Sequence, residues 1–305
     1  MPISKNVAKS IKFDEFYTLM ADVEAELNHY TPFLKGKTIY CCCDNPQFSN
    51  FSKYFISNHK RIGIKNLICS WYQAGESATK WAEYDADSNQ YIYHIMNGDG
   101  NFESEDCKSL FQLADVIVTN PPFSRSQSFL EFLLKNNKKF IIVCNRNTII
   151  TKKIFPYFMN HTIKFGHGFN GNTGHFMIPP TLYGHYSNDV VRKEENIVRF
   201  RNVSWITNLD VEVPNKKISL TKKYSSRRYK KYDQYDAINV DKISDIPYDY
   251  SGVMGVPITI LDKFDYTQFE LLGLDRFMPL NSSGKRFSIK GKEKYARVLI
   301  RKINN

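Results

Sequence analysis

The chain has 305 residues, of which 42% are hydrophobic and 14% aromatic, so it can bury a substantial core and is not expected to be disordered. It contains no apolar run of about 18 residues, and no signal-peptide pattern opens it. We therefore predict a soluble, cytoplasmic protein without a membrane partner. None of its six cysteines forms a Cys-x-x-Cys pair, and this spacing predicts reduced thiols rather than disulfides or a zinc site.

The formal net charge of +11 comes entirely from the second half of the chain. Residues 1–150 carry 16 basic and 16 acidic side chains, whereas residues 151–305 carry 26 and 15. A neutral first half and a basic second half predict a chemical module followed by a module that binds a polyanion, with nucleic acid favoured. General solubility is the alternative explanation for the charge.

The predicted elements begin after a mildly basic lead at residues 1–13. A helical pattern runs to about residue 30 and is expected to end at Thr31-Pro32. Residues 38–43 form a predicted strand that leads into Asp44-Asn-Pro-Gln-Phe-Ser-Asn-Phe51, where Ser49 or Asn50 can cap a helix that runs to about residue 58. An acidic residue after the first strand, then a turn and a helix, is typical of a nucleotide-cofactor site. The usual Gly-x-Gly pattern is absent.

Two further strands are predicted at residues 66–71 and 91–96, and residues 75–90 between them are predicted as a short helix or an excursion. The turn Asn97-Gly-Asp-Gly-Asn-Phe102 follows the third strand. Turns of this composition are common without any function.

The most informative stretch is Asp115-Val-Ile-Val-Thr-Asn-Pro-Pro-Phe123. Its β-branched run predicts a fully buried parallel strand, and the two prolines stop that strand. The tetrapeptide then lies beyond the carboxyl edge of the sheet, where open α/β sheets bind ligands. The side-chain oxygen of Asn120 and the carbonyl of Pro121 can accept two hydrogen bonds from one amino group, and Phe123 can stack on the planar molecule that carries it. A strand followed by a turn is the alternative.

Apolar positions on both sides of this strand predict helices around residues 110–113 and 129–134, and residues 140–144 and 202–209 form further predicted strands. Strands that alternate with helices predict an α/β fold with a right-handed, doubly wound parallel sheet. The glycine- and histidine-containing stretch 165–176 lacks the context of a phosphate loop and makes a poor metal site, so no metal is expected.

A basic segment follows the last predicted strand, with tyrosines between its charges and no acidic residue. Basic side chains neutralise phosphates, and tyrosines can stack on bases or sugars, although a solvated loop is the alternative. The eight basic residues are Lys216, Lys217, Lys222, Lys223, Arg227, Arg228, Lys230 and Lys231, and the tyrosines are Tyr224, Tyr229 and Tyr232. A second basic cluster occupies residues 285–302.

Several of these blocks resemble a known family. Asn-Pro-Pro-Phe at 120–123 is similar to the motif of amino-group methyltransferases that use S-adenosylmethionine. More specifically, Tyr40-Cys-Cys-Cys-Asp-Asn-Pro-Gln-Phe-Ser-Asn-Phe-Ser-Lys-Tyr-Phe55 resembles the EcoRI-type adenine-specific DNA methyltransferases, in which this segment replaces the glycine-rich loop. The resemblance covers nearly the whole chain. It continues in Asp14-Glu-Phe-Tyr-Thr18, Trp205-Ile-Thr-Asn-Leu-Asp210, Tyr235-Asp-Ala-Ile-Asn-Val240, Asp245-Ile-Pro-Tyr-Asp-Tyr-Ser-Gly-Val-Met-Gly-Val-Pro-Ile258 and Tyr295-Ala-Arg-Val-Leu-Ile300.

The resemblance implies a Rossmann-like class I methyltransferase domain in residues 1–210 and a basic DNA target-recognition region in residues 211–305. It implies transfer of a methyl group from S-adenosylmethionine, which leaves as S-adenosylhomocysteine, to N6 of a flipped-out adenine in duplex DNA. The implied catalytic residues are Asn120, Pro121, Pro122 and Phe123. The implied cofactor-binding residues are Tyr17, Thr18, Asp44, Pro46, Phe51, Asp99, Phe102 and Asn120, and the eight basic residues of the segment at 216–231 are the implied DNA contacts.

The implied setting is a restriction–modification system, or an orphan methylase. We expect a monomer that acts on double-stranded DNA and forms no stable complex with a cognate restriction endonuclease, where one exists. The alternatives are an RNA or protein-glutamine methyltransferase and a catalytically inactive nucleic-acid-binding protein of the same fold. The basic second half argues against a protein substrate, the EcoRI-type blocks argue against RNA, and the intact motif with Asp44 argues against an inactive protein.

Overall fold

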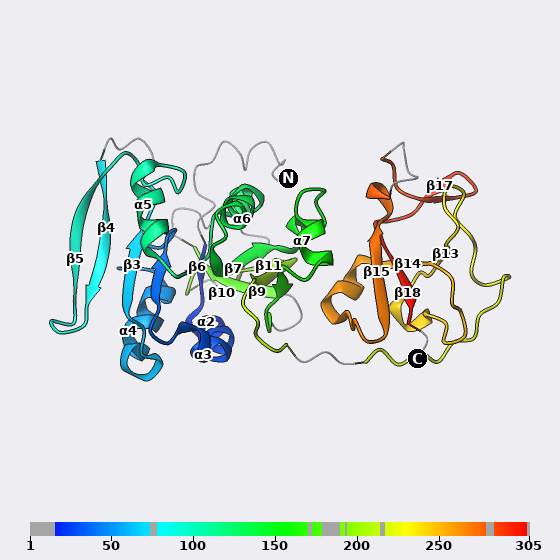
Figure 1. Ribbon diagram of the computed structural model, residues 1–305, viewed down its shortest axis with the longest axis horizontal. Coiled ribbons are helices and arrows are strands. Elements are labelled where there is room, and N and C mark those ends of the chain that lie inside the picture. The colour runs from blue at the N-terminus through cyan, green and yellow to red at the C-terminus, as the bar shows by residue number, and fades with distance from the viewer. Residues whose placement is uncertain are drawn as a thin grey trace. The chain divides into compact units, whose positions relative to one another are not determined.

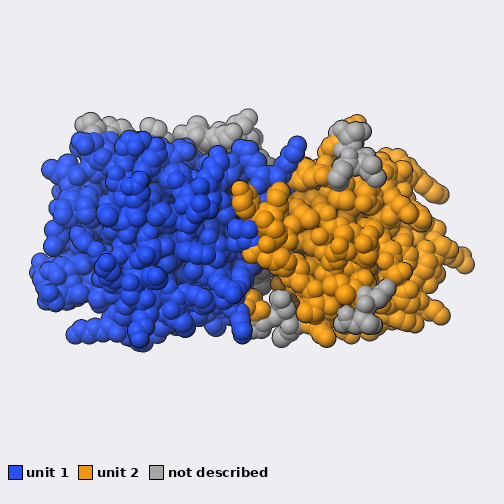
Figure 2. All heavy atoms as spheres, viewed as in Figure 1, with its two compact units in different colours: residues 1–154, 162–212 blue, residues 155–161, 213–305 orange. Residues whose placement is uncertain are grey.

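The computed structural model describes residues 16–73, 78–169, 173–178, 190–192, 194–213, 217–278 and 284–303. They form two compact units (Figure 2). The first contains residues up to 154 and 162–212, and the second contains 155–161 and the residues from 213 onward. The lead at residues 1–13 and Lys216 lie outside the described residues. None of the described helices has the length and apolar character needed to span a membrane.

The first unit is built on an eight-stranded mixed sheet with the order β5-β4-β3-β2-β6-β7-β12-β8 (Figure 1). Its strands are β2 Thr38–Cys41, β3 Asn66–Ser70, β4 Ala78–Asp85, β5 Gln90–Asn97, β6 Val116–Thr119, β7 Lys139–Asn145, β8 Lys164–Phe165 and β12 Val203–Thr207. The central strands β3, β2, β6 and β7 are parallel. In contrast, β4 pairs antiparallel with β3 and β5, and β12 pairs antiparallel with β7 and β8. The α/β class is therefore confirmed.

Helices cover both faces of this sheet, α5 and α6 on one face and α2 and α4 on the other (Figure 1). The side-chain oxygen of Ser49 caps α4 by accepting a hydrogen bond from the backbone of Phe51 at 3.1 Å, and Gly63, with φ of 71°, ends it. The helices and 3₁₀ turns are α2 Met20–Leu27, η1 Asn28–Tyr30, α3 Thr31–Leu34, α4 Asn50–Ile62, α5 Glu105–Leu113, η2 Phe123–Arg125, α6 Ser126–Lys135 and η3 Arg146–Thr148.

The chain changes direction across the sheet between β2 and β6. From β2 it moves outward to β3, and from β6 it moves outward on the other side to β7. Such a switch point opens a crevice at the carboxyl ends of the strands, where ligands of open α/β sheets bind. Asp44 lies just beyond β2, and Asn120 follows β6 directly, so both predicted site residues lie at this switch point.

Two sequence expectations were wrong in detail. The third strand, predicted at 91–96, is present as β5, but it pairs antiparallel with β4, which occupies much of the expected helix or excursion at 75–90. The polar connection closes a hairpin because the Asp85 carboxylate accepts a hydrogen bond from the backbone of Asp87 and Asn89 adopts a left-handed conformation. Pro32 also lies in the first turn of α3 instead of ending the helical segment, since the first turn of a helix tolerates proline.

A second, four-stranded antiparallel sheet belongs to the same unit. Its order is β1-β9-β11-β10, and its strands are β1 Tyr17–Thr18, β9 Thr173–Met177, β10 Val190–Arg192 and β11 Ile197–Arg201. The pairing of Thr18 with Phe176 joins the beginning of the described chain to a segment far along the sequence.

The second unit contains α7 Phe155–Met159 and a four-stranded sheet with the order β13-β14-β18-β15. Tyr232, Ala237, Phe287 and Leu299 form a hydrophobic cluster in its core. Its remaining elements are β13 Ile238–Asn239, η6 Ile243–Asp245, β14 Met254–Pro257, η7 Ile258–Lys263, β15 Phe269–Leu274, η8 Asp275–Phe277, β16 Ser288–Ile289, β17 Lys292–Glu293 and β18 Arg297–Lys302.

The turn after β5 supplies a test of the fold, because two of its glycines differ in the space around them. Both have positive φ, but a Cβ on Gly100 would lie 2.1 Å from the carbonyl oxygen of Trp71, whereas nothing lies within 4 Å of one on Gly98. Gly98→Ala should cost about 1–2 kcal/mol of unfolding free energy from backbone strain. Gly100→Ala should cost about 1–3 kcal/mol more, because the carbonyl must move. Urea unfolding of both variants measures the difference, and equal losses would contradict this placement of the turn.

Candidate active site

The strand β6 ends in a rigid, buried tetrapeptide. All of β6 is buried, Pro121 is buried after it, and Pro122 leads into η2 and then α6. The two prolines lack backbone N–H groups and fix φ, so the chain leaves the sheet in one direction. Asn120 is only 8% exposed at this point.

The amide of Asn120 has a defined orientation. Its Nδ2 donates a hydrogen bond of 2.6 Å to the backbone carbonyl of Phe16. A carbonyl can only accept, so the nitrogen must face Phe16 and Oδ1 must face the other way. Oδ1 is buried and has no hydrogen-bond partner among the described residues. Buried polar atoms normally have partners, and an unpaired acceptor is therefore a candidate position for a ligand donor.

Aromatic side chains from separate segments of the chain gather around the motif. The ring centroid of Phe123 lies 5.3 Å from Phe16, 5.5 Å from Phe176 and 6.0 Å from Phe200. The last three come from the start of the described chain, β9 and β11. The second sheet therefore supplies an apolar, aromatic wall beside Asn120.

Asp44 connects the two sides of the switch point. The carboxylate is 4% exposed and accepts hydrogen bonds from Ser49 Oγ at 2.7 Å, from Thr119 Oγ1 at 2.6 Å and from the backbone of Asn120. Burial raises the pKa of Asp44 to about 6, and these three hydrogen bonds act in the opposite direction. One side chain thus binds the cap of α4 and the end of β6.

The loop after β2 is held by its own polar groups instead of glycines. The Asn45 side chain accepts from the backbone of Gln47, the Asn45 carbonyl accepts from that of Ser49, and the Pro46 carbonyl accepts from Ser52 Oγ at 3.2 Å. Pro46 is buried in this turn. A cofactor that approaches here would meet a preformed turn.

The predicted residues of β1 lie over this loop. The carbonyl of Thr18 accepts a 2.8 Å hydrogen bond from Asn50 Nδ2, and Thr18 Oγ1 is buried without a partner in the described part of the chain. The ring of Tyr17 lies 6.3 Å from that of Phe48, which is more than half exposed. Thr18, Asp44 and Asn120 are thereby brought to one edge of the sheet.

Two predicted cofactor residues are packed in the core. Phe51 is 1% exposed and contacts Trp205 edge to face at 5.7 Å. Phe102 packs against Phe129 at 5.0 Å and lies under the guanidinium of Arg125. A cofactor contact by either ring stays a prediction, to which this packing adds no support.

Asp99, in the turn that follows β5, lies beside the carboxyl end of β3. Its carbonyl accepts a 2.7 Å hydrogen bond from the backbone of Gln73, which follows β3, and its carboxylate accepts one from the backbone of Asn101. The turn therefore lies at the carboxyl edge, one strand away from Asp44. Its contact with a cofactor stays a prediction.

Seven of the eight predicted DNA-binding residues are described, and most of them are exposed. Arg228 pairs with Asp245 at 3.0 Å and Lys231 pairs with Asp236 at 2.6 Å. The other five form no ion pair with a described acidic residue and leave their charge available. They are Lys217, Lys222, Lys223, Arg227 and Lys230.

The tyrosines between these charges do not all face solvent, which corrects the sequence interpretation. Tyr229 is buried and donates a hydrogen bond to the Asp245 carbonyl, and Tyr232 is buried and donates one to Asn239. They support the second unit from inside, because a buried tyrosine needs a partner for its hydroxyl. Only Tyr224 remains half exposed.

Sequence reasoning singled out the blocks that contain Phe16 and Phe176 but gave neither ring a role of its own, and it missed Phe200 and the role of Asn50. The aromatic residues are far apart in the chain and show no common spacing. Asn50 carried a local signal as a possible helix cap, but Ser49 takes that position and the Asn50 amide instead reaches β1.

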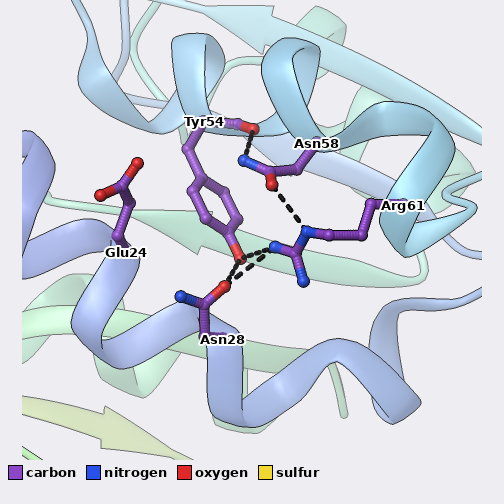
Figure 3. A pocket seen from close by; sticks show the side chains of 5 residues that line it. All are labelled: Glu24, Asn28, Tyr54, Asn58 and Arg61. Carbon is purple, nitrogen blue, oxygen red and sulfur yellow. Dashed lines mark hydrogen bonds between the residues drawn. The ribbon is translucent and has the colours of Figure 1, made fainter.

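A separate hollow lies on the first unit and is lined by none of the predicted residues (Figure 3). Arg61 donates to the side chains of Asn28, Tyr54 and Asn58 there, so its guanidinium is already bound. Glu24 completes the lining. Within the described ranges, no group of three His, Cys, Asp or Glu side chains could hold a metal ion.

An α/β sheet that presents Asn-Pro-Pro-Phe at its switch point is the arrangement of an amino-group methyltransferase. Comparison with known proteins defines the family. The family described as "Adenine-specific methyltransferase EcoRI" matches residues 4–303, and the chain belongs to it. It is an adenine-specific DNA methyltransferase.

Three curated relatives match over nearly their whole lengths. Type II methyltransferase M.EcoRI of Escherichia coli is 39% identical over 96% of this chain and 94% of its own length. M.MgeORF184P of Mycoplasma genitalium is 32% identical over 97% and 98%, and M.MpnI of Mycoplasma pneumoniae is 31% identical over 98% of each chain. No solved structure matches.

The buried carboxylate predicts a pH dependence of stability. With a pKa of about 6 in the fold against an ordinary 3.8, Asp44 binds its proton more tightly when folded. Its contribution is present below pH of about 4 and is lost as the pH rises to about 6. The unfolding free energy of the wild type, relative to Asp44→Asn, should fall by about 3 kcal/mol across that window and then stay level. Urea unfolding at each pH tests this, and a flat difference would contradict it.

The bond from Asn50 to β1 predicts a loss of activity without unfolding. Asn50→Asp cannot donate to the Thr18 carbonyl, so β1 should loosen over the site, and methyl transfer should fall about tenfold or more, as expected for loss of a bond worth about 1.4 kcal/mol. Asn58→Asp is the matched control, because that amide donates to the Tyr54 carbonyl and accepts from Arg61, both in its own helix, and makes no contact with β1. Rates should differ between the two variants while their melting temperatures stay similar.

Proposed function

We propose that the enzyme transfers a methyl group from S-adenosylmethionine to the exocyclic N6 of adenine in duplex DNA. The observation that carries this is the buried, unpaired Oδ1 of Asn120 beside the Pro121 carbonyl at the switch point. These two acceptors match the two N–H groups of an adenine amino group. The first unit supplies a class I methyltransferase architecture of the Rossmann-like, doubly wound type, and the parallel β3-β2-β6-β7 core supports that assignment.

The nitrogen to be methylated is a poor nucleophile, because its lone pair is delocalised into the purine ring. Asn120 and Pro121 would accept its two hydrogens, draw the nitrogen toward tetrahedral geometry and stabilise the positive charge that develops on it. Nitrogen forms the new bond to the methyl carbon as the carbon–sulfur bond breaks, and the surplus proton leaves to water. Because the substrate is positioned against a strong electrophile, orientation supplies much of the rate.

The Phe16 carbonyl keeps the Asn120 amide in its accepting orientation during this reaction. The base must leave the helix to reach the edge of the sheet, since its amino group is paired inside the duplex. Phe123 would stack on the flipped adenine, and the wall of Phe16, Phe176 and Phe200 would support Phe123 from behind.

The residues at the carboxyl edge fit S-adenosylmethionine as the methyl donor. The buried Thr18 Oγ1, which has no hydrogen-bond partner in the described part of the chain, is a polar atom that this ligand could satisfy. Thr18, Asp44, Pro46 and Asp99 would hold the donor, with Tyr17 at the exposed side. When bound, the donor supplies a sulfonium-activated methyl group and leaves as S-adenosylhomocysteine.

The second unit would act as the target-recognition region. The five basic side chains in the segment 217–231 that form no ion pair with a described acidic residue support contacts to phosphates, which set the register on the duplex while other groups read base edges. We further propose that the enzyme acts in the cytoplasm as a monomer and as the modification part of a restriction–modification system, without a stable complex with an endonuclease. The names of the relatives support a type II modification role.

The test is transfer of radiolabelled methyl groups from S-adenosylmethionine to unmethylated duplex DNA, followed by digestion to nucleosides. The label should appear in N6-methyldeoxyadenosine. Asn120→Ala should lower the turnover rate about 10²–10³-fold, as for loss of one aligned transition-state partner, and Asn136→Ala, an exposed amide at the end of α6, should not.

Each alternative has its own outcome in this assay. Cofactor binding with label in RNA or protein glutamine, but not in any duplex DNA, would contradict the DNA assignment. Binding of cofactor and DNA without transfer to any substrate would indicate an inactive binding protein.

A further inference from the structure

A short hairpin of the second unit carries two exposed lysines at its turn. It consists of β16 and β17, joined by Lys290 and Gly291, which have φ of 51° and 73°. Two consecutive left-handed residues are the requirement of a tight hairpin turn. The side chains of Lys290 and Lys292 are exposed, and neither forms an ion pair with a described acidic residue.

The turn is held by one carboxylate. Asp233 accepts hydrogen bonds from the backbone of Lys290 and of Gly291, both at 2.9 Å, and from Ser288 Oγ at 2.8 Å. These bonds keep the pKa of Asp233 below its usual range, so it is ionised whenever the protein is folded near neutral pH.

The next residue strengthens this clamp. Gln234 Oε1 accepts from the backbone of Ser288 at 2.9 Å, and its Nε2 donates to Ser288 Oγ at 2.6 Å. The backbone of Asp233 also donates to the Ser288 carbonyl. An isolated two-stranded hairpin is marginal in water, so its fixed position depends on these contacts and on the packing of Ile289 against the core cluster.

The clamp joins the hairpin to the basic segment. Asp233 and Gln234 follow Lys230 and Lys231 directly in the chain, so the lysines of the tip are attached beside the exposed charges already assigned to DNA. Fixing the backbone of two lysines lowers the entropy cost of placing their charges on a partner. Phosphates recur at regular intervals along a duplex, so two lysines at a fixed distance from each other suit such a partner.

Resting on the proposed function, we infer that the β16–β17 hairpin is a DNA-backbone contact, in which Lys290 and Lys292 neutralise phosphates of the duplex and Asp233 is the residue that positions them. The chemistry recognised is the phosphate of duplex DNA, so the contact is independent of sequence.

The first test measures binding of the full-length enzyme to a fluorescein-labelled duplex of mixed sequence between about 50 and about 200 mM salt. Lys290→Ala combined with Lys292→Ala should bind about tenfold more weakly, and the slope of log affinity against log salt should become less negative by about 1.8, since each phosphate contact contributes about 0.9. Lys60→Ala combined with Lys65→Ala removes the same charge from exposed positions of the first unit and should leave the slope within about 0.5 of wild type.

The second test separates positioning from net charge. Asp233→Asn makes the protein more basic, so general electrostatics predicts tighter binding, whereas loss of the clamp predicts weaker binding. We expect a loss of about threefold or more, the effect of roughly 0.6 kcal/mol, with the melting temperature close to that of wild type. Asp87→Asn, which adds the same charge on the exposed β4–β5 connection, should bind at least as well as wild type.

Failure of this inference differs from failure of the proposed function. If wild type methylates and binds DNA but the double lysine variant matches its control, or Asp233→Asn binds more tightly, the hairpin is not a DNA contact. If wild type neither binds nor methylates duplex DNA, the proposed function itself is wrong.

Discussion

The rest of the site depends on the buried carboxylate of Asp44. Removing a carboxylate from water costs several kcal/mol, and here Ser49, Thr119 and the backbone of Asn120 offset that cost with hydrogen bonds. Each donor belongs to a different functional part, namely the cap of α4, the end of β6 and the motif itself. A carboxylate that must satisfy all three fixes their relative positions, because a buried acceptor left unpaired would be costly. In other cofactor loops, glycines and a bound phosphate group fix the conformation of the loop. Here the hydrogen bonds to Asp44 fix it.

A second buried carboxylate fixes the wall that faces the motif. Glu26 on α2 accepts hydrogen bonds from Tyr30 and from the backbones of His167 and Gly168. Burial raises its pKa, and these bonds act against that rise. A Cβ on Gly166 would lie 2.0 Å from Glu26 Oε1, so the glycine is required for this approach. Because this segment leads to β9, which pairs with β1, the carboxylate of Glu26 helps to place the aromatic wall beside Asn120.

Local patterns predicted the central parallel strands, α4 with a cap at Ser49 or Asn50, and the position of the motif, because burial periodicity and capping depend on neighbouring residues. They did not predict the β4–β5 hairpin, whose polar connection also suits a helix or an excursion. They could not predict the bond from Asn120 to the Phe16 carbonyl, because it joins backbone and side chain across 104 positions. They also predicted that Tyr229 and Tyr232 were available to stack on nucleic acid, since a tyrosine among lysines has no local signal of burial. The predictions that failed concern features that depend on packing between residues far apart in the sequence.

The uneven charge of the chain follows from the two opposite demands of the proposed reaction. The methyl donor is a cation and charge develops positively on the attacked nitrogen, so the site needs acceptors and no excess of basic residues. Duplex DNA is a polyanion and needs that excess. Residues 1–150, which contain Asp44, Asp99 and Asn120, balance 16 basic against 16 acidic side chains, and the surplus lies entirely beyond them. A cation bound near Asp44 would also favour its ionised form and lower its pKa.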